Sequence, residues 1–157
     1  MNKLATFDAS LSINPTSAQV DQFLALDPAR PVVFVNLHEY HERARYPEAY
    51  RGVESPAVTG REAYHRYLRR VEKDYLPQVG ARFLIVAPCA LVMIGEGEWS
   101  EAVIGCYPSR AAAMHMPTLP GYVDLQVHRV AGLKKALTIA LTDGALARLP
   151  PGVLPEG

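Results

Sequence analysis

Residues 99–113 hold the feature that most constrains the fold, a buried strand that passes directly into a helix. The β-branched side chains of Val103 and Ile104 suit the half-buried surface of a sheet. Pro108 lacks the N–H group that a sheet ladder needs, so the strand ends there. Ser109 is placed to cap the next helix, which the following alanines continue at little entropic cost. The stretch therefore predicts a strand joined tightly to a helix.

Capping boxes and apolar runs predict the other elements. Thr16 with Gln19, and Thr59 with Glu62, match the pattern that begins a helix. Helices are predicted over residues 16–27, 59–77 and 119–131, in addition to the one that follows Ser109. Strands are predicted over residues 32–38, 82–94, 99–107 and 133–141.

The strand over residues 82–94 is expected to carry a bulge at Pro88. A turn at residues 95–98 would then pair it with the strand that starts at Trp99, as an antiparallel hairpin. Residues 39–56 are polar and rich in tyrosine, and they are predicted as a long loop. Such loops in compact domains often carry function.

The order of elements predicts an α+β fold. Strand–helix–strand, repeated around a central hairpin, is the split βαβ or ferredoxin-like arrangement, with a four-stranded antiparallel sheet. Its helices cover one face of the sheet, and the other face is largely apolar here and must also be buried. A second copy of the chain would cover it with one self-complementary surface. We therefore expect a homodimer that forms through the sheet face.

Composition limits the partners and the location. The chain has 157 residues, enough for one domain over residues 31–142, preceded by an extension with a short helix (1–30) and followed by a Pro/Gly-rich tail (143–157). Sixteen basic residues balance sixteen acidic ones, which argues against binding to nucleic acid or an anionic membrane. The start lacks an apolar signal-peptide core, and Cys89 and Cys106 are expected to be reduced. A cross-strand disulfide is the alternative. These features indicate a cytoplasmic protein.

A set of short motifs resembles the domain of unknown function 1330 family, of the dimeric α/β-barrel superfamily. The matching residues lie between positions 15 and 141: Asn36-Leu37, Tyr46-Pro47, Gly60, Ala63, Tyr64, Tyr67, Trp99, Tyr107-Pro108-Ser109, Tyr122 and His128-Arg129. The chain departs from the family at His38-Glu39-Tyr40, where an arginine is expected, and at Gly80, where a glycine pair is expected. The resemblance implies a dimeric barrel with a cavity beneath the sheet and assigns no reaction.

The candidate site gathers polar and aromatic side chains around that cavity. His128 and His38 are the candidate catalytic residues, because an imidazole titrates near neutral pH. The candidate substrate-binding residues are Asn36, Tyr67, Trp99 and Arg129. Residues 40–50 would form a lid. Neighbours on a helix point about 100° apart, so we expect Arg129 rather than His128 to face the cavity.

Each candidate also has a structural alternative. Asn36 would tie the sheet to a loop or helix through a hydrogen bond. Arg129 would form a buried ion pair with Glu39 or Asp124, and His128 would cap its helix. The aromatic residues would belong to the core. His38 and His41 lack a third ligand at a recognised spacing, so neither a metal site nor a cofactor is expected. A haem-handling protein would need an accessible histidine on the cavity wall.

Two classes of function follow. The first is a small cofactor-independent enzyme, monooxygenase-like or isomerase-like, that acts on a small apolar or aromatic acid. The second is a non-catalytic small-molecule-binding or accessory protein that uses the same cavity. Both functions rest on analogy with proteins of the same fold and on the polar residues named above.

Overall fold

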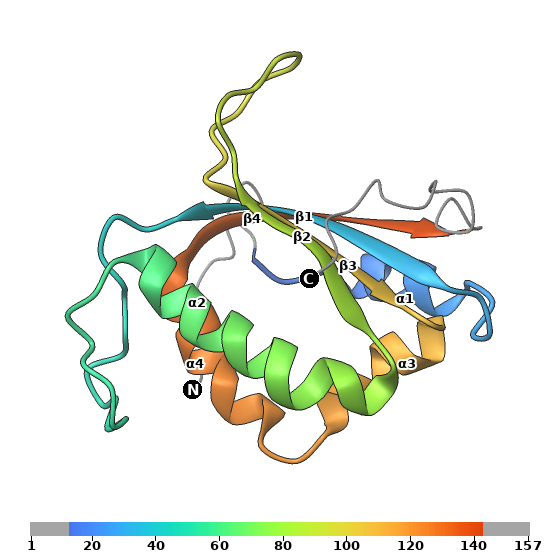
Figure 1. The fold of residues 1–157 in the computed structure, drawn as a ribbon, viewed down its shortest axis with the longest axis horizontal. Coiled ribbons are helices and arrows are strands. Elements are labelled where there is room, and N and C mark those ends of the chain that lie inside the picture. The colour runs from blue at the N-terminus through green and yellow to red at the C-terminus, as the bar shows by residue number, and fades with distance from the viewer. Residues whose placement is uncertain (1–12, 143–157) are drawn as a thin grey trace.

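One antiparallel sheet with the strand order β2-β3-β1-β4 forms the centre of the computed structural model, which describes residues 13–142 (Figure 1). The strands are β1 (Val32–Tyr40), β2 (Arg82–Pro88), β3 (Glu101–Tyr107) and β4 (Leu133–Thr142). All neighbouring strands run antiparallel, with β1 and β3 in the middle. This confirms the ferredoxin-like α+β prediction. The predicted tail and the first twelve residues of the N-terminal extension lie outside the described residues.

Three of the helices begin where the sequence places their caps, and the last begins at Tyr122, three residues after its predicted start. The helices are α1 (Ser17–Leu24), α2 (Gly60–Arg70), α3 (Arg110–His115) and α4 (Tyr122–Gly132). Both predicted capping boxes are present, and Ser109 accepts a hydrogen bond from the Ala112 amide at 3.0 Å. Beyond α2 the chain continues as a π-helical turn and a 3-10 turn, and it ends at Gly80 with a φ of 70°. Glycine adopts this left-handed conformation without a steric penalty.

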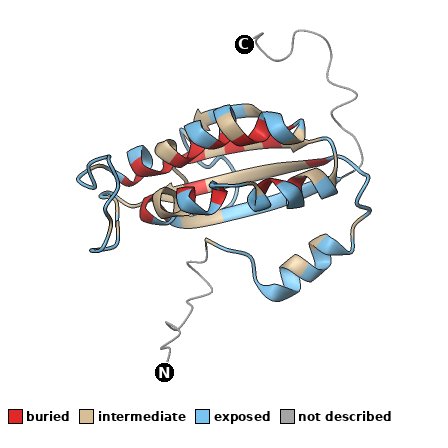
Figure 2. Cartoon of the chain, turned by 90° about the horizontal axis from the view of Figure 1, so that it is seen from below, coloured by how far each residue is buried: buried red, intermediate tan, exposed pale blue. Residues whose placement is uncertain are grey.

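The two faces of the sheet differ in what covers them. α2 and α4 lie together under one face, and buried residues are concentrated between these helices and the sheet (Figures 1 and 2). Along β1, the alternation of side chains places His38 on the helix-covered face and Leu37 on the opposite face. We call the opposite face the open face. It presents apolar rows such as Leu137, Ile139 and Leu141 of β4, which are all exposed.

The prediction of one long strand over residues 82–94 is wrong. β2 ends at Pro88, β3 starts at Glu101 rather than Trp99, and the last hydrogen bond between them joins the Cys89 amide to the Ser100 carbonyl. Gly95 and Gly97, both with positive φ, follow in the connection between β2 and β3. Residues 90–94 have no strand there with which to pair. The register shift lies between Phe83 and Ile85, not at Pro88. Residues 89–100, which we call the arm, rise from the open face (Figure 1).

Two smaller differences concern β1 and the cysteines. The strand runs to Tyr40, two residues beyond its predicted end, because Glu39 and Tyr40 still pair with β4. Cys89 and Cys106 are both free thiols, so the alternative of a cross-strand disulfide is wrong. Among residues 13–142, no helix is long and apolar enough to cross a membrane.

Two glycines let α2 and α4 meet at the end of β1. A Cβ atom on Gly132 would lie 2.4 Å from the Gly60 carbonyl oxygen and 2.7 Å from the Tyr64 amide nitrogen. Backbone hydrogen bonds join the three elements here, from the His41 amide to the Gly132 carbonyl and from the Gly60 amide to the His41 carbonyl. The start of α2 is thereby fixed against both β1 and α4.

We predict that Gly132→Ala destabilises the fold. The added methyl group meets backbone atoms rather than the flexible end of a side chain, so the helices must separate, at a cost of about 1–3 kcal/mol. Urea denaturation followed by circular dichroism measures the change. Gly105→Ala is the matched control, because its Cβ would lie 3.4 Å from a Phe83 ring atom, which is ordinary contact. Equal stability of the two variants would contradict the prediction.

Candidate functional site

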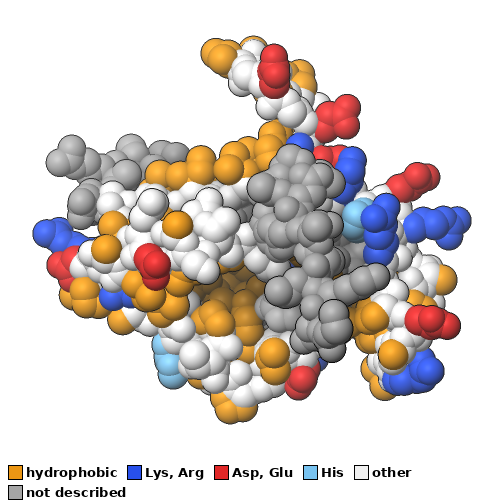
Figure 3. Space-filling view, turned by 180° about the vertical axis from the view of Figure 1, so that it is seen from behind, with side chains coloured by type: hydrophobic (Ala, Val, Ile, Leu, Met, Phe, Trp, Pro, Cys, Tyr) orange, Lys and Arg blue, Asp and Glu red, His pale blue; other side chains and the backbone are white. Residues whose placement is uncertain are grey.

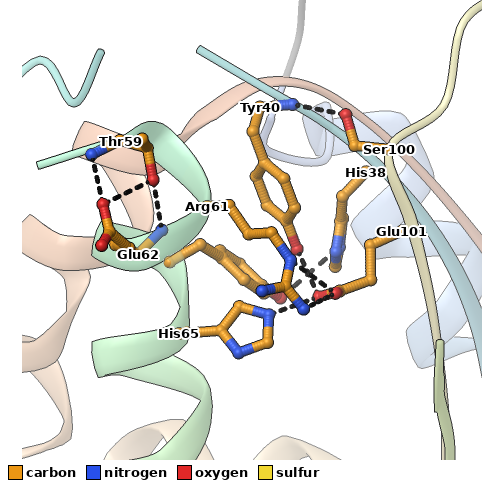
Figure 4. Close-up of polar contacts among 9 residues, drawn as sticks. His38, Tyr40, Thr59, Arg61, Glu62, His65, Ser100 and Glu101 are labelled. Carbon is orange, nitrogen blue, oxygen red and sulfur yellow. Dashed lines mark hydrogen bonds and ion pairs between the residues drawn. The ribbon is translucent and has the colours of Figure 1, made fainter. Parts of the chain in front are cut away.

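A buried carboxylate ties together β1, β3 and α2. The Glu101 side chain is completely buried at the start of β3. Its Oε1 accepts hydrogen bonds from the Tyr40 hydroxyl at 2.8 Å and from His65 Nε2 at 2.6 Å, and its Oε2 accepts from Arg61 Nη2 at 2.7 Å (Figure 4). A buried carboxylate is stable only with such donors. This cluster therefore holds α2 in position over the sheet.

The donors also set the ionisation of the cluster. Burial alone would raise the pKa of Glu101, but hydrogen bonds from Tyr40, Arg61 and His65 outweigh it and hold the pKa below its usual value. Burial and the neighbouring Glu101 carboxylate raise the pKa of Tyr40 far above its usual value. Glu101 is therefore charged at neutral pH, and Tyr40 remains a hydrogen-bond donor.

His38 lies beside this cluster with one ring nitrogen unused. The residue is 4 % exposed, and its Nε2 lies 3.5 Å from the Tyr64 hydroxyl (Figure 4). Its Nδ1 is buried and has no hydrogen-bond partner among the described residues. Burial, aided by the positive charge of Arg129, lowers the pKa of His38 to about 4. At neutral pH His38 is therefore an uncharged imidazole.

Tyrosine rings continue from His38 into the helical layer. The Tyr64 ring lies 4.6 Å from His38 and 5.5 Å from Tyr67, measured between centroids. The hydroxyls of Tyr67 and Tyr122 are 2.6 Å apart. Burial raises the pKa of Tyr67 to about 12, so this hydroxyl stays protonated. Tyr67, a predicted substrate-binding residue, is 8 % exposed and belongs to the core cluster.

Asn36 lies on the helix-covered face and binds both neighbouring strands. Its Nδ2 donates to the Val103 carbonyl at 2.9 Å, and its Oδ1 accepts from the Thr138 hydroxyl at 2.8 Å. The expected alternative of a bond to a loop or helix is therefore replaced by bonds within the sheet. Thr138 and Ala140 stay exposed although they face the helical side. The helices thus leave this part of the sheet uncovered.

A hollow lies between the sheet and the helices on this side. Figure 3 shows it in the centre of the molecule, with apolar side chains at its bottom. Arg129 of α4 is half-buried, and its Nη1 donates to the Asn14 side-chain oxygen at 3.0 Å while its Nη2 donates to the Ile13 carbonyl. Burial lowers the pKa of His38 and raises the pKa of Tyr64, and the positive charge of Arg129 acts to lower both pKa values. The described contacts of its guanidinium are to neutral oxygens, in place of the expected ion pair with Glu39 or Asp124.

His128 points to a different surface. Its Nδ1 lies 2.7 Å from the Tyr46 hydroxyl, which also accepts from Arg66 Nη1 at 3.0 Å, and its Nε2 lies 3.7 Å from Glu54. Burial lowers its pKa. Tyr46 and Tyr50 stack at 4.5 Å over this group. The tyrosine-rich loop therefore packs on His128 and α2, and His128 makes these loop contacts rather than capping its helix.

Trp99 also lies away from the hollow. Its ring is 4.2 Å from Lys135 Nζ, and Lys135 pairs in register with Glu39. Both of these residues alternate to the open face, opposite His38. The structure thus places His38, Asn36 and Arg129 on the helix-covered side of the sheet, Trp99 toward the open face and His128 against the tyrosine-rich loop.

A second, more polar cleft lies on the surface between α2 and the preceding loop. It has a volume of about 370 Å³ and is lined by Glu54, Val58, Arg61, Glu62, His65, Arg66 and Arg69. Several of its polar side chains already have partners within the protein, because Arg61 and His65 bind Glu101 and Arg66 binds Tyr46. Within residues 13–142, no group of three His, Cys, Asp or Glu side chains is placed to hold a metal ion.

Sequence reasoning missed the Glu101 cluster. The signal was present, because Glu101 is a charged residue at the start of an apolar strand, and a buried acid needs partners. Its donors come from a strand end and a helix face that lie far away in the sequence. None of Glu101, Arg61 and His65 is therefore among the candidate site residues that the sequence predicts.

Solved structures that are similar to this chain over most of its length include two of one protein. The methylated RPA0582 protein is 30% identical with a TM-score of 0.74, over 91% of this chain and 98% of that chain. The RPA0582 protein of unknown function from Rhodopseudomonas palustris is 30% identical with a TM-score of 0.72, over 84% and 96%. No protein-family model and no curated protein matches, so the resemblance to the domain of unknown function 1330 family is not confirmed.

We predict that Glu101 makes stability fall in acid. Its folded pKa is lowered, so the ionised carboxylate stabilises the fold above its unfolded pKa, near 4.5, and this contribution is lost as pH falls through the folded pKa. Glu101→Gln removes the charge and destabilises the protein by about 3 kcal/mol at pH 7. Denaturation measured from pH 7 to pH 3 compares the two proteins.

The difference between them should shrink as pH falls. Glu72→Gln is the control, because Glu72 is an exposed carboxylate in the turn that continues the same helix. A constant difference between wild type and Glu101→Gln across this range would contradict the assignment.

Proposed function

The chain belongs to the family of the RPA0582 protein from Rhodopseudomonas palustris, and we propose that it binds a small apolar or aromatic carboxylic acid and acts as a homodimer. The observation that carries the proposed ligand is the half-buried Arg129 guanidinium on the helix-covered side, whose described partners are neutral oxygens only. In this proposal it borders the hollow. A guanidinium forms its strongest hydrogen bonds with a carboxylate, which accepts two parallel N–H groups.

Both terminal nitrogens of Arg129 already donate hydrogen bonds. The Ile13 carbonyl and the Asn14 side chain present two oxygens to its two terminal nitrogens. A ligand carboxylate would replace both with charged oxygens, in a place that the sheet and the helices partly shield from water. The apolar bottom of the hollow would take the body of the acid (Figure 3).

His38 supports the same ligand from the deeper side. An unpaired buried nitrogen costs about 1–3 kcal/mol, and the Nδ1 of His38 is such an atom among the described residues. A hydroxyl or carbonyl on the ligand would satisfy it. Asn36 would act through Thr138, to which it is bound, rather than as a free anchor.

An isomerase-like enzyme is the second candidate, and the uncharged His38 imidazole would be its base. A pKa of about 4 leaves this imidazole unprotonated at neutral pH but makes it a weak base, which ranks proton transfer behind binding. His128, the other candidate catalyst, contacts Tyr46 and the loop instead. Binding without turnover therefore leads, and proton transfer at His38 is the alternative.

We predict that Arg129→Ala weakens binding of small aromatic acids about 10- to 100-fold, because charge-assisted hydrogen bonds contribute about 1.5–3 kcal/mol. The probes are benzoate and phenylacetate, measured by ligand-detected NMR and calorimetry. Arg69→Ala is the matched control, since Arg69 is an exposed arginine on α2.

Unchanged binding in Arg129→Ala would overturn the proposed site. If Arg129→Ala instead fails to fold, Arg129→Lys tests the same point, because it keeps the charge and loses the paired donors. Recovery of each probe after incubation in D₂O separates the two functions. An acid returned without deuterium supports binding, and an acid that has exchanged a carbon-bound proton supports proton transfer.

The homodimer is proposed from the open face. Ile85, Leu137, Ile139 and Leu141 are each 40 % exposed or more. Among the described residues, the charges on this face lie toward the ends of the strands, at Arg82 and at Glu39 with Lys134 and Lys135. One apolar face that matches itself is the simplest basis for a two-fold dimer.

We predict that Ile139→Glu makes the protein monomeric, because two carboxylates would be buried against apolar surface at the interface. Sedimentation velocity at micromolar concentration measures the change. Val123→Glu on α4 is the matched control, at a residue that is 71 % exposed and far from the sheet face. A monomeric wild type would overturn the dimer.

A further inference from the structure

The arm exposes apolar side chains beyond the edge of the sheet. Leu91 is 66 % exposed, Met93 84 % and Ile94 95 %. Figure 3 shows hydrophobic side chains at the far end of a projection that stands clear of the rest of the molecule, with acidic side chains on the same projection. Within one chain these apolar side chains remain in contact with water. The folding of the arm therefore does not gain the free energy of burying them.

Hydrogen bonds hold the base of the arm against β1, and they set the direction in which the arm points. The Ser100 amide donates to the His38 carbonyl at 2.7 Å, and the Ser100 hydroxyl accepts from the Tyr40 amide. The Trp99 ring lies over Lys135 on the open face. The arm therefore rises on the same side as the apolar rows of the sheet, away from the helices (Figure 1).

The area of the open face indicates what the arm contacts. Strands of seven to ten residues, at ~3.3 Å per residue and ~4.8 Å apart, give a face of roughly 500 Å². A standard interface buries about 800 Å² of accessible surface on each partner. The exposed apolar side chains of the arm would add to the contribution of the sheet face.

We infer that the arm clasps the second copy of the chain, with Met93 and Ile94 packed along the outward row of the partner's β4. This inference rests on the proposed homodimer. A two-fold axis that runs along the strands places the β2–β3 edge of one copy over the β4 edge of the other. The two most exposed apolar surfaces on this side, the arm and the Leu137–Ile139–Leu141 row, then meet twice in each dimer.

Site-specific crosslinking tests the contact directly. A benzophenone amino acid replaces Ile94, and equal amounts of ¹⁴N- and ¹⁵N-labelled protein are mixed before irradiation. Mass spectrometry then distinguishes links within a chain from links between chains. We expect mixed-isotope links from Ile94 to residues of β4. The control position is Val53, which is equally exposed on another loop.

Substitution tests the energetic contribution. M93E/I94E should raise the dimer dissociation constant at least about tenfold, whereas Val53→Glu should leave it unchanged. Both changes lie outside the sheet and helices, so circular dichroism should show the fold intact.

The outcomes separate the two proposals. A monomeric wild type overturns the dimer and the clasp together. A stable wild-type dimer with an unchanged dissociation constant in M93E/I94E, and links from Ile94 only within one chain, overturns the clasp and leaves the dimer in place.

Discussion

The buried Glu101 carboxylate is the interaction on which the positions of the other site residues depend. It accepts hydrogen bonds from β1 through Tyr40 and from α2 through Arg61 and His65. Because a charged carboxylate inside a protein requires these donors, α2 cannot slide along the sheet without leaving the charge unsatisfied. Tyr64, one turn along the same helix face, is held against His38 as a consequence.

The alternation of side chains along β1 places polar residues on one face of the sheet and apolar residues on the other. His38 and Asn36 point toward the helices, and Leu37 points toward the open face. A shift of one residue in the register would exchange these sets and place a histidine and an amide on the apolar face. The hydrogen bonds of Asn36 to Val103 and Thr138 oppose such a shift, because they require the observed alignment of three strands. Asn36 thus serves the register of the sheet at the border of the hollow.

Local signals predicted most of the fold. Capping boxes and the Ser109 cap act within a few residues, and each was found where the sequence placed it. The arm was missed because residues 90–94 are apolar like a strand, and only the absence of a pairing partner shows that they are not one.

The site was less predictable, because its contacts join distant segments. Trp99 was expected at the cavity, but the side that it occupies depends on the alternation of a neighbouring strand. His128 and Arg129 are adjacent in sequence, yet one contacts Tyr46 and the other contacts Asn14. Helical geometry alone predicted that they diverge, but not which loop each would meet. The partners of Glu101 come from two elements whose spacing in sequence carries no sign of the contact.

The proposed ligand site and the proposed dimer use opposite faces of the same sheet, so neither blocks the other. Arg129 approaches from α4 on the helical side, and Ile139 lies on the open side of β4. Thr138, next to Ile139 in the chain, faces the hollow and binds Asn36. Burial of the Ile139 side would hold β4 in place along its length, and Thr138 with it. A dimer would therefore stiffen the wall of the hollow through the backbone of one strand, without adding any residue to it.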